Sequence, residues 1–313
     1  MSVKISIAIT TYNGEKYLRE QIDSLYSQTL VPDEIIVVDD CSTDNTQLIL
    51  EQYHISKGLI YFVNEKNLGI NKNFEKALSF CTGDYIALCD QDDIWFPDKL
   101  LKSYNKIRQI EYDEPALISS NNIFVDENLK IINIPKFDKD DENYSTTLLG
   151  HYSQGCTLFM NKKLKKLIIP FPDDNRMVFD MYIGLVAAMI GNKYYLAEPL
   201  MFYRSHSNNA HANVSSVNLS LKCRIKNKYK KKFPGLIPNE RYPLMIYVKK
   251  MHGSEFKSDR KKLYDKLLKL FELDNIFKEI YTILSIKEIS LIKRITILRD
   301  TYISRLLKIN PQN

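Results

Sequence analysis

Hydrophobic and polar positions follow two alternating periods along the first two hundred residues. Four short apolar segments have the length of buried strands, and each ends in polar residues. They are VKISIAITTYN at 3–13, DEIIVVDD at 33–40, LIYFVNE at 59–65 and DYIALCDQDD at 84–93. The stretches between them carry apolar residues at helical spacing, as at Tyr17, Ile22, Leu25 and Tyr26. The pattern therefore predicts strands that alternate with helices.

This alternation predicts an α/β fold with a mixed, mainly parallel sheet flanked by helices. In such sheets, ligands bind outside the carboxyl ends of the strands. Three strand ends carry polar chemistry here, in the sequences TTYN, VDDCSTD and CDQDD, and we expect them to converge on one crevice. The dinucleotide fingerprint GxGxxG is absent, so NAD or FAD is not indicated.

The second half of the chain is less uniform. Residues 113–150 are irregular, 154–161 and 193–206 are typical of strands, and 178–191 of an apolar helix. After about residue 215 a basic run at 222–233 precedes helical patterns. We predict a catalytic domain at 1–215 and a basic helical C-terminal region at 216–313.

Composition narrows the class of protein only moderately. The 313 residues are 44% hydrophobic and 26% charged, which is ordinary for a globular protein. A net charge of +6 suits an anionic partner such as a membrane surface or a phosphate-bearing substrate, and does not imply nucleic acid. The five cysteines are odd in number and show no CxxC spacing, which favours free thiols in a reducing compartment. They are Cys41, Cys81, Cys89, Cys156 and Cys223.

The chain shows no signal-peptide pattern, and its longest apolar stretch is too short to span a bilayer. We therefore expect a cytoplasmic protein. The basic run beside an amphipathic Ile/Leu/Arg/Lys helix also suits peripheral contact with an anionic inner membrane face. The alternative, equally weighted, is that these helices pack on the catalytic domain or on a second subunit.

Three carboxylates lie within four positions, at Asp90, Asp92 and Asp93. Like charges raise each other's pKa, and a divalent cation removes the conflict. Magnesium and manganese prefer oxygen ligands and typically use one or two carboxylates together with substrate phosphates. Asp-x-Asp at a strand end is therefore suited to hold a metal and a diphosphate. The alternative is a solvated acidic turn that caps the helix predicted to start near Pro97.

The ordered motifs SIAITTYNGEKYLREQIDSLYSQTLVPDEIIVVDDCSTDNT, NEKNLGINKNFEKAL and GDYIALCDQDDIWFPDKL resemble the family 2 glycosyltransferases over residues 3–210. The resemblance implies the GT-A fold, a Rossmann-like architecture, and an inverting, metal-dependent enzyme. The QDDIW form resembles members that build bacterial surface polysaccharides, including rhamnosyltransferases.

The resemblance implies a set of donor-binding residues. Thr10 and Tyr12 would line the nucleobase pocket, with Tyr12 stacking on the base. Asp40 would accept a hydrogen bond from the pyrimidine N3–H, which uracil and thymine share, so UDP and dTDP are not separated. Lys72 and Asn73 would border the base and the diphosphate.

It also implies the metal ligands and the catalytic base. Asp92 would ligate Mn²⁺ or Mg²⁺, and Asp90 would face the ribose or join the metal site. Asp180 would take the proton of the acceptor hydroxyl as general base. Arg204 and His206 match a loop that closes on the diphosphate or the metal.

Each assignment has a structural alternative. Tyr12 could be a core aromatic residue, and Lys72 only a surface helix lysine. Asp40 and Asp180 could cap helices. We expect Asp93 to cap the following helix or to support the metal site.

The resemblance implies an enzyme that adds one or a few sugars to a growing bacterial glycan. Such acceptor glycans are often linked to a lipid. The QxxRW motif of processive synthases is absent. Alternatives are a magnesium phosphatase of the haloacid dehalogenase type, or an inactive sugar-binding or scaffold protein. Sugar and acceptor specificity should lie in loops 133–155 and 205–216.

Overall fold

The computed structural model describes residues 3–109, 113–135, 147–148, 154–174, 177–206, 241–271 and 283. The strands are β1 (Ile5–Thr11), β2 (Glu34–Asp39), β3 (Ile60–Val63), β4 (Tyr85–Cys89), β5 (Ile94–Trp95), β6 (Ala116–Val125), β7 (Ile131–Asn133), β8 (Phe159–Asn161) and β9 (Asn192–Arg204). The helices are α1 (Leu18–Tyr26), α2 (Thr46–Lys57), α3 (Ile70–Phe80), α4 (Lys99–Ile107), the 3₁₀ helix η1 (Gly155–Thr157), α6 (Lys162–Ile168), α7 (Phe179–Ile190), α9 (Arg241–His252) and α10 (Ser258–Phe271).

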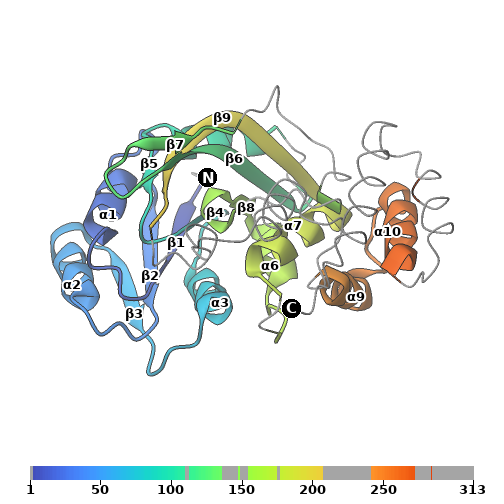
Figure 1. The fold of residues 1–313 in the computed structure, drawn as a ribbon, viewed down its shortest axis with the longest axis horizontal. Coiled ribbons are helices and arrows are strands. Elements are labelled where there is room, and N and C mark those ends of the chain that lie inside the picture. Colours follow the sequence, from blue (N-terminus) through green and yellow to red (C-terminus); the bar gives the residue numbers. More distant parts are fainter. Residues whose placement is uncertain are drawn as a thin grey trace, which may run out of the picture. The chain divides into compact units, whose positions relative to one another are not determined.

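The strands form one mixed sheet in the order β3-β2-β1-β4-β8-β6-β9-β5, with β7 paired to β6 (Figure 1). The pairs among β1, β2, β3 and β4 are parallel, whereas β8 is antiparallel to both β4 and β6. The predicted mixed, mainly parallel sheet is therefore confirmed.

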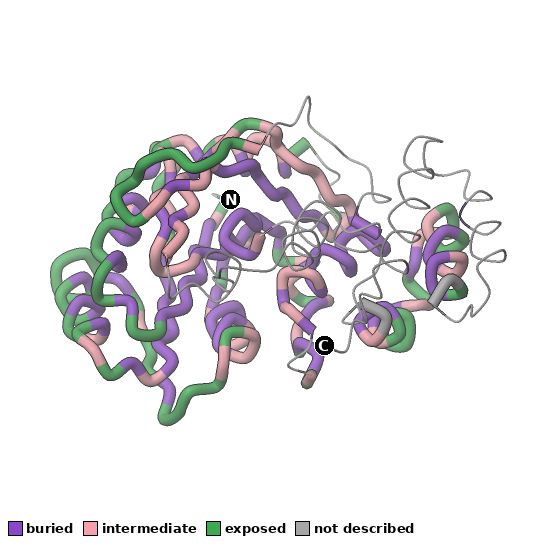
Figure 2. The backbone as a smooth tube through the Cα atoms, in the orientation of Figure 1, coloured by how far each residue is buried: buried purple, intermediate pink, exposed green. Residues whose placement is uncertain are grey.

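Alternate side chains of the central strands pack in opposite directions, as the two-residue period of a strand requires. Ile7 and Ile9 of β1 join a core with apolar residues of α1, α2 and α4. Helix α3 packs across β1 and β2, where its Phe74 is fully buried. Figure 2 shows the central strands in purple as buried, with green exposed positions on the surrounding helices. The sheet therefore has helices on both faces, which leaves its strand ends to carry the site.

The 113–150 segment that the sequence leaves irregular contains the ten-residue strand β6. Its centre reads Ser-Ser-Asn-Asn, residues that are depleted or neutral in strands. They are nonetheless buried, and Asn121 Nδ2 donates to the carbonyls of Pro135 and Ala197 at 2.9 and 3.1 Å. The predicted strand at 154–161 is only half correct, because η1 precedes the short β8. In β6, tertiary hydrogen bonds override local preference.

Contacts divide the chain into two units. Unit 1 comprises Met1–Glu142, Ser153–Ala187 and Gly191–Asn213, and unit 2 comprises Asn143–Tyr152, Ala188–Ile190 and Val214–Asn313. Within unit 2, α9 and α10 are joined by a hydrogen bond from Tyr264 Oη to the Met245 carbonyl at 2.6 Å. The predicted boundary at 215, the basic run and the C-terminal amphipathic helix lie outside the described residues. Among the described helices, none is long and apolar enough to cross a membrane.

Candidate active site

The carboxyl ends of β1 and β2 are tied together by polar side chains. Thr11 Oγ1 donates to Asp39 Oδ1 at 2.7 Å, and the Asn13 amide donates to Ser42 Oγ at 2.8 Å. Asp39 is fully buried, so these contacts replace the water that its carboxylate would otherwise bind. The predicted convergence of the first two strand ends is thus a feature of the structure.

Asp40, one residue further, organises the loop before α3. Its carboxylate accepts hydrogen bonds from Asn64 Nδ2 at 2.8 Å and from the amides of Leu68 and Gly69 at 2.8 and 2.9 Å. The residue is only 3% exposed. Asp40 therefore holds the start of α3 and does not cap α2, whose N-cap is Asn45.

Asn73 belongs to the same buried network. Its Nδ2 donates to the Val38 carbonyl at 2.9 Å, and its Oδ1 accepts from Asn64 Nδ2 at 2.9 Å. Lys72, by contrast, is partly exposed and pairs with Glu75 at 3.1 Å. Asn73 thus fixes α3 against β2, whereas the Lys72 ammonium is available to solvent. Their roles towards a donor stay predictions.

Tyr12 and Thr10 differ sharply in exposure. Tyr12 is 48% exposed, so the alternative of a core aromatic residue is wrong. Thr10 is largely buried on β1. An exposed aromatic ring directly after a central strand can stack on a planar ligand, which is the contact predicted for the nucleobase.

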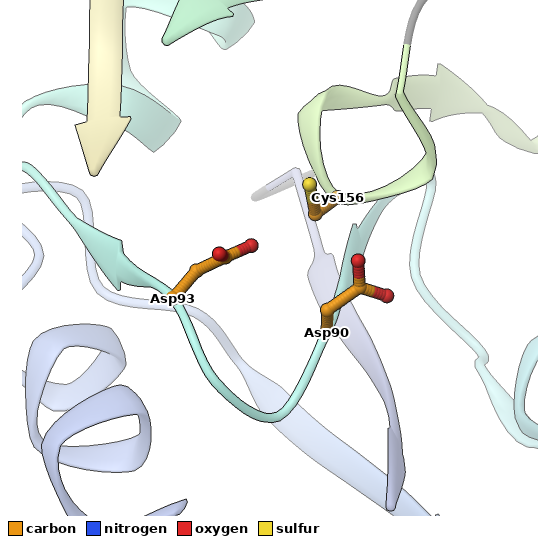
Figure 3. Close-up of side chains that lie close together, drawn as sticks. All are labelled: Asp90, Asp93 and Cys156. Carbon is orange, nitrogen blue, oxygen red and sulfur yellow. The ribbon is translucent and has the colours of Figure 1, made fainter. Parts of the chain in front are cut away.

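The Asp90-Gln91-Asp92-Asp93 turn, which follows β4, brings two acids to one thiol. Figure 3 shows Asp90 and Asp93 on either side of this turn, with Cys156 of η1 above them. The nearest ligand atoms of these three residues all lie within 4.8 Å of one another. Burial, followed by the charge of Asp92, raises the pKa of Asp90 to about 7. The charge of Asp180 adds to this rise in the pKa of Asp90.

Cys156 acts here as a protonated group. Burial, together with the charges of Asp93 and Asp90, raises the pKa of its thiol well above the usual value. A protonated thiol next to these acids offers no thiolate to a soft metal. It is one of four described cysteines, all of them free, while Cys223 lies outside the described residues.

Asp93 is not a helix cap, because α4 has Asp98 at its N-cap. Asp93 is instead 1% exposed, and its Oδ1 accepts from the Arg204 amide at 3.1 Å. Its Oδ2 is buried without a hydrogen-bond partner among the described residues. Burial and the neighbouring acids raise its pKa strongly. The capping alternative is thus wrong, and Asp93 supports the turn from within.

Asp92 and His206 form the pair that best fits a divalent cation. His206 Nε2 lies 2.8 Å from Asp92 Oδ2, and both side chains are mostly buried. Carboxylate oxygen and imidazole nitrogen are ligands that suit Mn²⁺, and carboxylate oxygen suits Mg²⁺. The adjacent Asp93 has a buried Oδ2 without a hydrogen-bond partner among the described residues, and a cation is a group that such an oxygen can bind. Asp92, His206 and Asp90 are therefore the residues that could hold the metal.

Arg204, at the end of β9, holds the turn at residues 90–93 in place through hydrogen bonds. Its Nε donates to the Asp92 carbonyl and its Nη1 to the Glu127 carbonyl, both at 2.9 Å. Its Nη2 pairs with Glu20, and the guanidinium lies over the Tyr17 ring at 4.4 Å. Arg204 is only 2% exposed. These contacts show a bracing role, while donor binding by Arg204 stays a prediction.

Asp180 is the second residue of α7, and the N-cap of this helix is Val178. The alternative that Asp180 caps its own helix is therefore wrong. The helix start is instead held by Asn71 of α3, whose Oδ1 accepts from the Phe179 amide at 3.1 Å and whose Nδ2 donates to the Met177 carbonyl at 2.7 Å. Asn71 therefore links the helix of the predicted donor-binding residues to the predicted base.

A buried lysine also escaped the sequence analysis. Lys99 donates to the Cys156 carbonyl at 2.8 Å and lies over the Trp95 ring at 4.3 Å. Burial lowers the pKa of Lys99 to about 8, although the nearby acids oppose this change. Its signal in the sequence is indistinguishable from that of a surface lysine in an amphipathic helix. The positions of Asn71 and Lys99 near the candidate site are thus known only from their contacts in the structure.

The fold and this arrangement of strand ends are those of a GT-A-like α/β domain. The profile of the family "Glycosyl transferase family 2" matches residues 6–168, just over half of the chain. The chain therefore belongs to glycosyl transferase family 2. Membership removes the basis of the phosphatase alternative, which depended on the Asp-x-Asp motif alone.

Relatives and solved structures agree with this membership. The dTDP-rhamnosyl transferase RfbG of Shigella flexneri is 31% identical over 253 residues, 75% of this chain and 80% of RfbG. An uncharacterized protein of Mycobacterium tuberculosis is 27% identical over 207 residues, and the chain covers only 59% of that relative's length. A crystal structure of S. aureus TarS 1–349 with UDP-GlcNAc has a TM-score of 0.62 at 21% identity, covering 95% of this chain and 79% of TarS. This last likeness shows the fold.

Proposed function

We propose that this chain transfers a sugar from a UDP- or dTDP-sugar to a hydroxyl of a growing bacterial surface glycan, with inversion and with Mn²⁺ or Mg²⁺. The observation that supports the proposal is the Asp92–His206 pair beside Asp90, whose carboxyl group also responds to the charge of Asp180, within a chain of glycosyl transferase family 2. A site of this kind provides cation ligands and a separate carboxylate that can accept a proton.

The donor end of the proposal draws on two relatives. TarS has been crystallised with UDP-GlcNAc, and RfbG is named a dTDP-rhamnosyl transferase. Both nucleotides carry a pyrimidine and a diphosphate. Exposed Tyr12 and buried Asp40 would offer the base a stacking surface and an acceptor, and Thr10, partly exposed Lys72 and buried Asn73 would complete the donor site.

The reaction needs one displacement. The acceptor oxygen bonds to the anomeric carbon while the bond from that carbon to the diphosphate oxygen breaks, and the acceptor proton passes to Asp180. Asp92, His206 and Asp90 would hold a divalent cation, which neutralises charge on the leaving diphosphate. Arg204 keeps the turn in place during this step. Inversion needs no second carboxylate as nucleophile.

The acceptor and the place of action are part of the same proposal. We propose a cytoplasmic enzyme that meets a lipid-linked glycan at the anionic inner membrane face and binds no nucleic acid. Sedimentation with vesicles of anionic and of neutral lipid tests the membrane contact. Salt-sensitive binding to anionic vesicles alone supports it, and equal absence of binding to both contradicts it.

A panel of UDP- and dTDP-sugars with Mn²⁺ or Mg²⁺, read as release of UDP or dTDP, tests the activity. Turnover with one donor would fix class and nucleotide together. Asp92→Ala should abolish metal-dependent turnover. Asp180→Asn should lose turnover while nucleotide binding persists, and full activity in this variant would refute the assignment of the base.

A further inference from the structure

Gln91, between the predicted metal ligands Asp90 and Asp92, contacts the backbone of a different strand end. Its Oε1 accepts from the Tyr12 amide at 2.8 Å, and its Nε2 donates to the Tyr12 carbonyl at 3.1 Å. One side-chain amide thus satisfies both backbone groups of the residue predicted to stack on the nucleobase.

These two hydrogen bonds extend the pairing of β1 with β4 beyond the last residues whose backbones pair. The parallel pairing of β1 with β4 ends at Ile9 opposite Cys89, and beyond this pair the two strands are no longer paired. Beyond this point the Gln91 side chain makes the contacts that a neighbouring strand would make. The two loops are therefore joined although their backbones no longer pair.

Gly14 is required for this approach. A Cβ added at Gly14 would lie 2.3 Å from Gln91 Oε1, 2.7 Å from its Cδ and 3.3 Å from its Nε2, so its three nearest neighbours all belong to this one side chain. Gly14 thus leaves the space that the amide occupies. Because the obstructed atoms are at the end of a flexible side chain, a methyl group there would displace the amide and leave the fold intact.

We propose that Gln91 is a positioning residue that aligns the two ends of the donor site. By fixing the Tyr12 backbone relative to Asp92, it sets the distance between the base-stacking ring and the metal ligand before a nucleotide diphosphate arrives. Without the Gln91 contacts, the conformation in which Tyr12 and Asp92 are aligned is only one of several. The apparent affinity for the nucleotide is then the intrinsic affinity multiplied by the fraction of molecules in that conformation. This inference rests on the proposed function.

A double-mutant cycle of Gln91→Ala, Gly14→Ala and the double variant tests it. Each single variant should weaken UDP or dTDP binding in the presence of Mn²⁺ by about 5- to 150-fold, the range that two neutral hydrogen bonds support. In the double variant the loss should equal that of Gln91→Ala alone, because the amide atoms nearest to the added methyl group are then absent. Gln52→Ala, which removes a surface amide bonded to Arg19, should leave binding unchanged.

Hydrogen exchange without nucleotide gives a readout independent of the proposed function. The Tyr12 amide should exchange faster in both single variants, since its acceptor is removed or displaced. Unchanged exchange or unchanged nucleotide affinity in Gln91→Ala would overturn the inference, as would additive losses in the double variant. If the unaltered chain bound neither UDP nor dTDP while Tyr12 exchange still changed, the proposed function would fall and the donor alignment with it.

Discussion

Replacement of Asn71 by Ala offers a test of how the predicted base is positioned. The first amides of a helix lack partners inside it, and Val178 supplies no side-chain cap to α7. Asn71 fills this gap from another helix through its contacts with Phe179 and Met177. The Ala variant removes both contacts and leaves the ring stack of Phe74 on Phe179, at 4.3 Å, as the remaining link.

The magnitude follows from these contacts. Loss of a helix cap costs about 1 kcal/mol, and loss of a second neutral hydrogen bond about 1 kcal/mol more. If this free energy holds Asp180 in its reactive place, kcat should fall by roughly 10- to 30-fold, because each 1.4 kcal/mol is a factor of ten. The donor KM should change by less than about threefold. Steady-state kinetics over a donor titration separates the two parameters.

Two further variants sharpen this test. Asn71→Asp keeps the acceptor for the Phe179 amide and should recover most of kcat. Asn161→Ala removes a buried Asn that caps α6 and bonds to the Ala116 amide, opposite the start of β4. This control should lower stability by a similar amount with kcat unchanged. A raised donor KM with normal kcat in Asn71→Ala would refute the link to Asp180.

Three other predictions concern the metal pair, the brace and the opposite end of the sheet. His206→Ala should raise the Mn²⁺ concentration for half-maximal activity by about tenfold, as expected when a metal ligand or its support is lost; an unchanged requirement would contradict the pairing with Asp92. Arg204→Ala removes the three hydrogen bonds of a buried guanidinium, so urea unfolding should show a loss of about 3 kcal/mol, and a loss below about 1 kcal/mol would count against a bracing role. Burial alone would raise the pKa of Glu34, but hydrogen bonds from neighbouring hydroxyls, an amide and an ammonium lower it to about 2. Because its folded pKa lies below the unfolded value of 4.5, its contribution is complete above pH 4.5 and is lost as the pH falls towards 2. Urea unfolding of Glu34→Gln should therefore show a deficit of about 1–2 kcal/mol at pH 7, after discounting for partial exposure, that shrinks by pH 3; a deficit independent of pH would contradict this origin.

The strand ends could be predicted from the sequence because they depend on periodicity and order along the chain. Acidic residues that directly follow a buried parallel strand lie at the carboxyl end of the sheet, independently of how the helices pack. Asp40 and Asp90 follow this rule. The contacts of Asn71 and Gln91 could not be predicted in this way. Their partners are backbone groups more than 70 positions away, and a side-chain amide carries no periodic signal.

Asp40 shows how a structural role and a predicted binding role can belong to one carboxylate. An ionised carboxylate offers about four lone-pair sites, and three described hydrogen bonds fill part of this capacity. The remaining acceptor position can take one more donor and can take no acceptor without repulsion. The N3–H of uracil or thymine meets this condition, whereas the unprotonated N3 of cytosine does not. The contacts that fix Asp40 in the fold would therefore make its last position selective for a base that donates.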